Sequence, residues 1–266
     1  ISVVEADEFD RSFLRLKPNI ACITSMDADH LDIYETKENF EEAFQQFANK
    51  ISNINHLLVA EYVPLPGLKV GFEPTSDFYI HHIKVKDGYQ WFDFKTPKGL
   101  IKQLAFPLPG KHNLMNAAMA VGMSLQYGIE EDVIKVALAN FAGVQRRFSF
   151  PIRTNNLVMI DDYAHHPTEI ISVLNAIKSG FKEKKIVTVF QPHRYSRVAS
   201  LKKEFANAFK DSDLVVLCPI YAASEKPIKN INHYELAKLI NKNSKKDVIC
   251  IENQFDLERF IKRHTY

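Results

Sequence analysis

The densest group of chemically active side chains follows an apolar run at residues 157–160. The chain places two carboxylates, a phenol and two imidazoles there, in the order Asp161-Asp162-Tyr163-Ala164-His165-His166-Pro167-Thr168-Glu169. The apolar run predicts a buried strand, and ligands in open α/β sheets bind beyond the carboxyl ends of strands. Pro167 suits the first turn of a following helix. The segment is therefore predicted to be a binding or catalytic site.

A second polar cluster follows the next apolar run, Ile186 to Phe190, in the same way. Its sequence is Gln191-Pro192-His193-Arg194-Tyr195-Ser196-Arg197. A guanidinium group matches the geometry of a carboxylate with two parallel hydrogen bonds. If the two strands are neighbours in a parallel sheet, Asp162 and Arg194 lie at one edge of it. The two clusters are then predicted to converge on one anionic substrate.

The elements that must position these clusters alternate regularly in residues 155–266. Strands are expected near residues 157, 186, 214 and 248, and each is followed by a helical segment, near residues 168, 198, 233 and 255. This alternation predicts a mostly parallel sheet wrapped by helices, with right-handed crossovers. The boundary with the preceding part of the chain is expected between Arg146 and Ile152. The predicted domains are residues 1–150 and 151–266.

The first 150 residues show a mixed pattern. Strands are expected at Ile1 to Val4 and at Asn19 to Thr24. Between Leu57 and Phe106, short apolar runs separated by Pro and Gly predict antiparallel hairpins. Apolar residues at three-and-four spacing, and apolar stretches of helical length, predict helices. The expected helices are Lys37 to Ile51, Lys111 to Tyr127 and Glu130 to Asn140.

Two side chains in this half also follow expected strands. Glu5 comes after the first strand and His30 after the second, so in a parallel sheet both can face one crevice. A carboxylate and an imidazole there can hold a divalent cation that in turn holds nucleotide phosphates, and oxygen ligands favour Mg²⁺. The competing interpretation is an exposed acidic loop at Glu5, with His30 as a helix-capping or surface histidine.

The helix expected at Lys111 opens with polar residues, from Gly110 to Asn116. Free backbone amides at a helix start, together with side-chain amides, can read the polar edges of a ligand. Asn113 is equally a candidate helix cap. Arg146 and Arg147 can neutralise a phosphate or form a salt bridge at the domain boundary.

Composition and charge exclude several classes of partner. The chain carries 34 Lys and Arg against 32 Asp and Glu, so the net charge of +2 gives no general reason to expect nucleic acid or an anionic membrane. The longest apolar run, Leu214 to Ala223, is too short to span a bilayer. The chain contains neither G-x-x-x-x-G-K-[ST] nor G-x-G-x-x-G. Separate cysteines without CxxC spacing fit buried, reduced thiols in a cytoplasmic protein; they are Cys22, Cys218 and Cys250.

Taken in order, six motifs resemble those of the Mur ligase family, which joins an amino acid to a UDP-sugar carboxylate with ATP. The motifs are Glu5-Ala6-Asp7-Glu8, Asp29-His30-Leu31-Asp32, Gly110-Lys111-His112-Asn113 through Asn116-Ala117, Arg146-Arg147-Phe148, Asp161 through Glu169, and Gln191 through Arg197. The resemblance implies part of a central ATPase domain followed by a Rossmann-like domain that binds the amino acid. It also implies ATP and Mg²⁺ as cofactors.

The resemblance carries roles to individual positions. The matched residues are Glu5 and His30 for magnesium; His112, Asn113 and Asn116 for adenine; Arg147 and Asp162 for the ATP phosphate and ribose; and Tyr163, His165, Arg194 and Arg197 for the incoming amino acid. Arg147, His165, Arg194 and Arg197 are the expected catalytic residues. An arginine pair that fixes the amino acid carboxylate aims its amine at an acyl phosphate, which is catalysis by positioning.

The last two motifs are most similar to family members that join L-alanine to UDP-N-acetylmuramate during peptidoglycan synthesis in the cytoplasm. The alternatives are attachment of a recycled murein tripeptide to the same UDP-sugar, and a non-catalytic nucleotide-binding module. The family's UDP-binding domain and P-loop are expected before Ile1, because the chain lacks both and does not begin with Met. The chain alone is therefore expected to be inactive.

Overall fold

The computed structural model describes residues 1–27, 31–86 and 89–264 and divides the chain into two compact units. Unit 1 comprises Ile1–Leu108 and His112–Ala142, and unit 2 comprises Pro109–Lys111 and Gly143–Tyr266. The division therefore follows Ala142, a few residues before the boundary expected from the sequence. The α/β fold class expected from the sequence is confirmed, with most strand pairs of the two larger sheets parallel.

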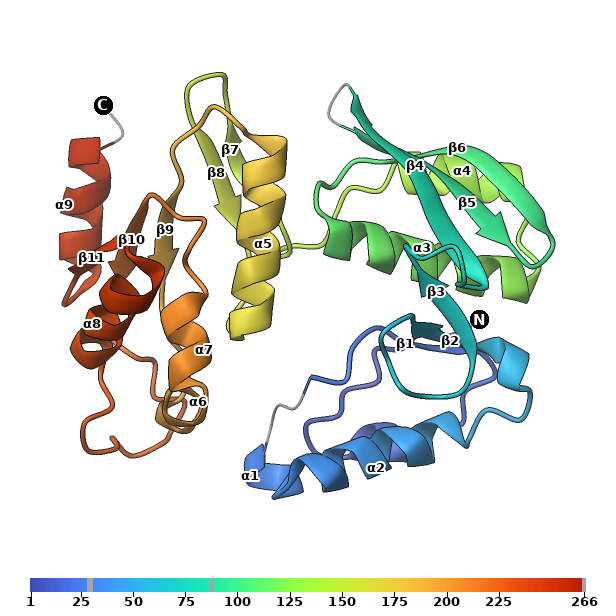
Figure 1. Ribbon diagram of the computed structural model, residues 1–266, viewed down its shortest axis with the longest axis horizontal. Helices are drawn as coiled ribbons and strands as arrows, with labels where there is room; N and C mark the ends of the chain where they lie inside the picture. The colour runs from blue at the N-terminus through green and yellow to red at the C-terminus, as the bar shows by residue number, and fades with distance from the viewer. Residues whose placement is uncertain (28–30, 87–88, 265–266) are drawn as a thin grey trace. The chain divides into compact units, whose positions relative to one another are not determined.

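Unit 1 is built on a six-stranded sheet in the order β1-β2-β3-β4-β5-β6 (Figure 1). Its strands are β1 (Ala21–Ile23), β2 (Leu57–Ala60), β3 (Leu68–Gly71), β4 (Phe78–Lys86), β5 (Tyr89–Thr96) and β6 (Gly99–Phe106). The hairpins expected for the last three strands are confirmed, because β4, β5 and β6 pair antiparallel. The hairpin prediction is wrong for β2 and β3, which pair in parallel with each other and with their outer neighbours.

The helices of this unit include those that apolar spacing predicts. They are the short 3-10 helices η1 (Ser12–Arg15) and η2 (Ile54–His56), with α1 (Leu31–Tyr34), α2 (Lys37–Ala48), α3 (Lys111–Tyr127) and α4 (Glu131–Ala139). Thr36 caps α2 by accepting a hydrogen bond from the backbone N–H of Asn39 at 3.2 Å. One face of α2 is buried in the core, through Phe40, Ala43, Phe47 and Ala48.

The strand expected at Ile1 to Val4 is wrong. These residues have no regular secondary structure, and the side chains of Ile1 and Val3 are 88% and 91% exposed. A strand needs a neighbour to accept and donate its ladder hydrogen bonds. In the part of unit 1 that the structure describes, the sheet ends at β1 and adds no strand from this segment.

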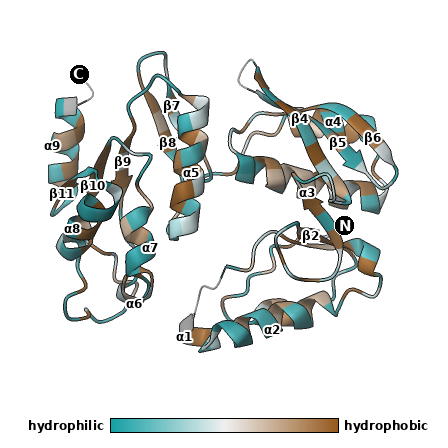
Figure 2. Ribbon diagram, in the orientation of Figure 1, coloured by the Kyte–Doolittle hydropathy of each residue, from teal (hydrophilic) through white to brown (hydrophobic). Residues whose placement is uncertain are grey.

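Unit 2 contains two sheets. In the first, β7 (Ser149–Arg153) pairs antiparallel with β8 (Val158–Asp161), and in the second, β9 (Val187–Phe190), β10 (Leu214–Leu217) and β11 (Asp247–Cys250) form a parallel sheet in the order β11-β10-β9. The strands of the parallel sheet appear largely in hydrophobic colours in Figure 2. The helices are α5 (Pro167–Gly180), α6 (Tyr195–Ser200), α7 (Lys202–Asn207), α8 (His233–Ser244) and α9 (Gln254–His264).

Helices cover both faces of the parallel sheet. Val215 and Leu217 of β10 share one buried cluster with residues of α5, α7 and α8. Val216, whose side chain lies on the opposite face, packs with Phe260 of α9. This layering confirms the helix-wrapped parallel sheet that the alternating pattern predicts.

The expectation that β8 and β9 are adjacent parallel strands is wrong for the residues described. β8 forms its ladder with β7, through a tight connection in which Thr154 and Leu157 exchange hydrogen bonds of 2.8 and 2.9 Å. A local hairpin closes a short loop, whereas a parallel partner requires a long crossover. The sequence prediction contained no strand at residues 149–153, so this hairpin was missed.

No helix among the described residues is both long and apolar enough to cross a bilayer. The three cysteines are free thiols and partly buried. Burial raises the pKa of the Cys22 thiol to about 11, so this thiol stays protonated at neutral pH.

Candidate functional site

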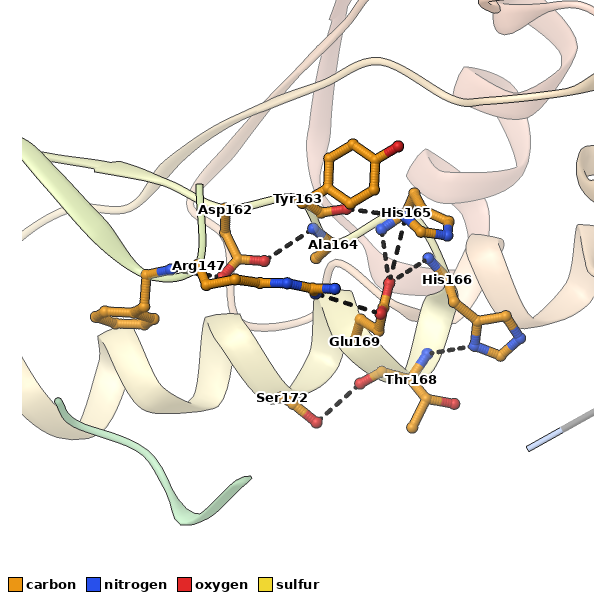
Figure 3. Close-up of polar contacts among 10 residues, drawn as sticks. Arg147, Asp162, Tyr163, Ala164, His165, His166, Thr168, Glu169 and Ser172 are labelled. Carbon is orange, nitrogen blue, oxygen red and sulfur yellow. Dashed lines mark hydrogen bonds and ion pairs between the residues drawn. The ribbon is translucent and has the colours of Figure 1, made fainter. Parts of the chain in front are cut away.

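The loop after β8 is held in place by Asp162. One carboxylate oxygen of Asp162 accepts a hydrogen bond from the backbone N–H of Phe148 at 2.9 Å, and the other accepts one from the backbone N–H of Ala164 at 2.8 Å (Figure 3). The backbone N–H of Tyr163 donates to the carbonyl of Arg146 at 2.8 Å. Asp162 therefore ties the Arg146 segment to the start of the polar cluster.

Glu169, in the first turn of α5, gathers the next part of the cluster. Its Oε2 accepts hydrogen bonds from the backbone N–H groups of His165 at 2.9 Å and His166 at 3.0 Å. Its Oε1 lies 3.8 Å from the guanidinium Nη1 of Arg147. Figure 3 draws this ion pair together with the hydrogen bonds to Oε2. His166 is the N-cap of α5 and Pro167 follows it, so Glu169 completes a capping box. The hydrogen bonds that begin α5 therefore also fix the backbone of the polar cluster.

Four rings bring the ends of β8 and β9 together. Tyr163 and His165 lie with ring centroids 5.1 Å apart, and each has its centroid 6.3 Å from that of His193. The ring of His193 lies 5.0 Å from that of Tyr221, in the segment after β10. The rings of the two sequence clusters therefore lie together in unit 2, although β8 and β9 are not hydrogen-bonded neighbours among the described residues; that the clusters share one anionic substrate stays a prediction.

Two arginines lie over the first of these rings. The guanidinium carbon of Arg146 is 4.8 Å from the ring centroid of Tyr163, and that of Arg147 is 5.7 Å from it. Cations over an aromatic face are held by the ring quadrupole. The side chain of Arg147 is 51% exposed, so it remains accessible to an anionic ligand.

The segment after β9 is fixed by backbone contacts to the segment after β10. The N–H of Arg194 donates to the carbonyl of Tyr221 at 2.9 Å, and the N–H of Tyr221 donates to the carbonyl of Pro192 at 2.8 Å. Ser196 donates its hydroxyl to Glu225 at 2.6 Å and its backbone N–H to the same carboxylate at 3.0 Å. These contacts hold the start of α6, where Arg194 is half-buried and Arg197 is buried.

The electrostatics of the cluster favour a neutral His193. Burial lowers the pKa of His193, and the nearby His165 and the arginines of the cluster lower it further. For Glu225, burial raises the pKa, but the hydrogen bonds from Ser196 and the charge of Arg194 outweigh that effect and lower it. The site thus combines a neutral imidazole with nearby cations, which suits an anionic ligand.

Backbone strain accompanies this arrangement. Arg194 has φ 65° and ψ 131°, a conformation that residues with a Cβ rarely adopt. Arg146 and Phe148 also have positive φ, of 59° and 51°. Such residues persist only where the surroundings hold them, and they concentrate at functional sites.

The candidate residues of unit 1 are described separately. His112 and Asn113 are half-buried and Asn116 is exposed, all in the first two turns of α3. Because α3 begins at Lys111, Asn113 lies inside the first turn and not at the N-cap. Glu5 is exposed, and His30 lies outside the described residues.

Several residues of the site were quoted in motifs without an expected role, or were not singled out at all. Glu169 and His193 belong to the first group, whereas Arg146 was expected, with Arg147, to neutralise a phosphate or form a salt bridge. Tyr221 and Glu225 belong to the second, because they follow β10, whose apolar run ends without a dense polar cluster. The available signal was topological: β10 lies beside β9, so its carboxyl end meets the same edge.

Comparisons with known proteins bear on both units. A model of the Mur ligase middle domain matches residues 2–124, and a model of the Mur ligase glutamate ligase domain matches residues 146–263. The UDP-N-acetylmuramate–L-alanine ligase of Flavobacterium psychrophilum is 49% identical over 246 residues, which are 92% of this chain and 55% of that protein. The ligase of the same name from Pelagibacter ubique is 37% identical, over 99% of this chain and 60% of that protein. The chain thus spans little more than half the length of these relatives.

Solved structures give the same fold. The crystal structure of the UDP-N-acetylmuramate–alanine ligase of Thermotoga maritima matches with a TM-score of 0.76 and 26% identity, covering 96% of this chain and 56% of that one. A murein peptide ligase from Psychrobacter arcticus matches with a TM-score of 0.58 and 18% identity, covering 94% of this chain and 53% of that one, and it shows the fold alone.

Proposed function

The chain belongs to the Mur ligase family, and from this premise we propose that it supplies part of the ATP site and the amino acid site of a ligase that joins L-alanine to UDP-N-acetylmuramate. The observation that carries the proposal is the convergence of Tyr163, His165 and His193 beside cationic side chains in unit 2. The identity of 49% to a ligase of that name supports the choice of substrate.

The proposed role of Arg194 and Arg197 is to bind the carboxylate of L-alanine. Both lie at the start of α6. The hydrogen bond from the backbone N–H of Arg194 to the carbonyl of Tyr221 fixes the backbone from which the Arg194 side chain extends. A guanidinium offers two parallel hydrogen bonds to a carboxylate. When the arginines hold the carboxylate, the amine of the amino acid points to the reacting acyl group. The reactants are then already oriented, so the reaction avoids the entropy loss of bringing two free molecules together.

His193 and His165 are proposed to handle the amine proton. The ammonium group of alanine must lose a proton before it can attack, and a neutral imidazole accepts one. The lowered pKa of His193 keeps its ring neutral near pH 7. The Nδ1–H of His165 donates a hydrogen bond to the carbonyl of Tyr163 at 2.9 Å, which fixes the orientation of its ring.

Nucleotide contacts are proposed on each unit by itself. In unit 2, Arg147 is the candidate for an ATP phosphate and Asp162 for the ribose; both oxygens of Asp162 already accept one backbone N–H each and retain lone pairs for a hydroxyl. In unit 1, the polar first turns of α3 are the candidate for adenine, through His112, Asn113 and Asn116.

The carboxylate of Glu5 has the oxygen donors that Mg²⁺ prefers, and its exposure leaves it accessible. When bound, Mg²⁺ would offset phosphate charge. Because ATP and UDP-sugars are cytoplasmic metabolites, the proposed reaction is a cytoplasmic one.

A chimera tests this function. The chain replaces the matching segment of the Flavobacterium psychrophilum ligase, and phosphate release is measured with ATP, UDP-N-acetylmuramate and either L-alanine or the murein tripeptide. We expect turnover with L-alanine and little with the tripeptide. Turnover with the tripeptide alone would favour the peptide-attaching alternative, and a folded, ATP-binding but inactive chimera would favour a non-catalytic module.

A further inference from the structure

Three side chains with metal-binding atoms meet on the β4–β5 hairpin of unit 1. The ring nitrogens of His81 and His82 and a carboxylate oxygen of Asp93 all lie within 4.8 Å of one another. Among the described residues, this is the one group of three or more His, Cys, Asp or Glu side chains whose donor atoms come this close together. None of the three belongs to a motif assigned above, and they come from the hairpin half of the unit 1 sheet.

A β-bulge puts both histidines on one face. Successive residues of a regular strand point to opposite faces, so adjacent histidines would normally be separated by the sheet. Here the register of β4 against β5 shifts between His81 and Lys84. His82 takes a left-handed backbone conformation, with φ 53°. The two imidazole rings consequently lie 4.4 Å apart between centroids.

Asp93 is the direct cross-strand partner of His81, so both side chains project from the same face. Its neighbours Phe92 and Phe94 point into the core, which places Asp93 on the solvent side. One oxygen of Asp93 accepts the backbone N–H of Gln103 at 2.9 Å, at a second bulge between β5 and β6. The other lies 2.9 Å from Nδ1 of His82.

In these positions, two imidazole nitrogens and one carboxylate oxygen are available to bind a metal ion. The hydrogen bond from Gln103 is the largest cause that lowers the pKa of Asp93, so the carboxylate is ionised. His81 is held by stacking on Tyr79, with centroids 4.8 Å apart and planes 7° from parallel. The His82 side chain is 72% exposed and can rotate toward an ion.

We propose that His81, His82 and Asp93 bind a Zn²⁺ ion, with water in the remaining position. Two imidazoles and one carboxylate are a set that zinc accepts, at bond lengths of about 2.0–2.2 Å. Tetrahedral ligands around such an ion lie roughly 3.3–3.5 Å apart. Closing the present spacing, in which the donor atoms lie within 4.8 Å of one another, to that range requires side-chain rotation, which the exposed His82 allows. The ion would link β4 to β5 across the bulge, independently of the function proposed for unit 2.

Zinc titration of the purified chain tests the site. Binding is measured by competition with a chromophoric chelator, in the wild type and in His81→Gln, His82→Asn and Asp93→Asn. Asparagine is chosen at position 82 because it tolerates positive φ. Asparagine at position 93 keeps the acceptor for the backbone N–H of Gln103. His56→Gln, in the same unit but outside the cluster, is the matched control.

We expect one zinc ion per chain, with affinity reduced by roughly tenfold to a hundredfold or more in each cluster variant and unchanged in His56→Gln. Circular dichroism checks that each variant is folded. Co²⁺ bound in place of Zn²⁺ should give the strong visible absorption of a four-coordinate ion, and His81→Gln should lose it. The proposal is overturned if the wild type binds no zinc, or if the cluster variants bind it as tightly as the wild type.

Discussion

Glycine at position 194 should leave unit 2 more stable than alanine does, and either substitution should remove the proposed anchor of the amino acid carboxylate. Arg194 has φ 65° and ψ 131°, where the Cβ of any L-residue except glycine meets its own backbone. Strain of this kind costs about 1–3 kcal/mol. Alanine at the same position keeps the strain, so the two variants form a matched pair that both lack the guanidinium.

The expected difference in stability follows from two opposing terms. Glycine relieves about 1–3 kcal/mol of strain but loses about 0.4–1 kcal/mol because the unfolded chain becomes more flexible. The net gain of glycine over alanine is on the order of 1 kcal/mol, or roughly 4 °C in melting temperature for a unit of this size. Chemical and thermal unfolding of both variants measure it.

The functional loss should be shared by both variants. A substrate carboxylate left without its guanidinium partner costs roughly 2–4 kcal/mol of binding, which is about thirtyfold to a thousandfold in the KM for L-alanine. The KM for ATP should change far less. Arg153→Ala, which removes an exposed arginine that contacts Phe150, is the control. These constants are measured in the chimeric ligase.

Two results would refute this reasoning separately. Equal stability of the glycine and alanine variants would show that position 194 carries no strain. An unchanged KM for L-alanine in both variants, with the protein folded, would remove Arg194 from the substrate site and with it the main reason for preferring alanine over a peptide.

Three further predictions follow from the same site. Glu169→Ala should lower the stability of unit 2 by about 1–2 kcal/mol in urea unfolding, because it removes the capping box. Glu169→Gln keeps an acceptor and should therefore cost less, so equal losses in the two variants would refute the capping role. The pKa of His193 is lowered in the folded chain, so its contribution to stability is complete above the unfolded pKa of about 6.5 and is lost as pH falls through the folded pKa. His193→Gln should reduce this loss of melting temperature at acid pH, and an unaltered pH profile of the melting temperature would contradict the prediction. The 266-residue chain alone should release no phosphate from ATP, because it has no P-loop motif to hold the β- and γ-phosphates; alanine-dependent phosphate release by the purified chain would overturn this.

The sequence predicted those parts of the structure whose signals are local. Apolar spacing located α2 closely, because its one buried face repeats with the helical period. The order of strands and helices after residue 155 identified the wrapped parallel sheet of unit 2, since a parallel pair needs a helical crossover. The polar clusters at the ends of β8 and β9 were found because each directly follows an apolar run in the sequence.

What the sequence did not predict depends on contacts between distant residues or on backbone twists. The pairing of β8 with β7 is decided by a loop at residues 154–157 and not by the composition of either strand. Tyr221 entered the site only because β10 lies beside β9. His81 and His82 read as alternating residues of a strand, and only the bulge brings their rings together.

The residues with a left-handed backbone locate both proposed sites. Among the described residues, the non-glycine positions with positive φ are Arg11, Glu35, His82, Gln103, Arg146, Phe148, Arg194, Ala223, Ser224, Asn230 and Lys245. Lys245 is the C-cap of α8 and Glu35 directly follows α1, which are ordinary places for this conformation. Arg11 is the N-cap of the short helix η1.

The remaining positions, apart from Asn230, fall into two groups. Arg146, Phe148, Arg194, Ala223 and Ser224 lie in the three segments that meet at the ring cluster of unit 2. His82 and Gln103 lie in the two bulges that flank Asp93. A sequence that folds consistently departs from local preference mainly where function requires it. A left-handed residue is a regular feature of a β-bulge, but two bulges on either side of Asp93 place its carboxylate and both imidazoles on one face, as the zinc proposal requires.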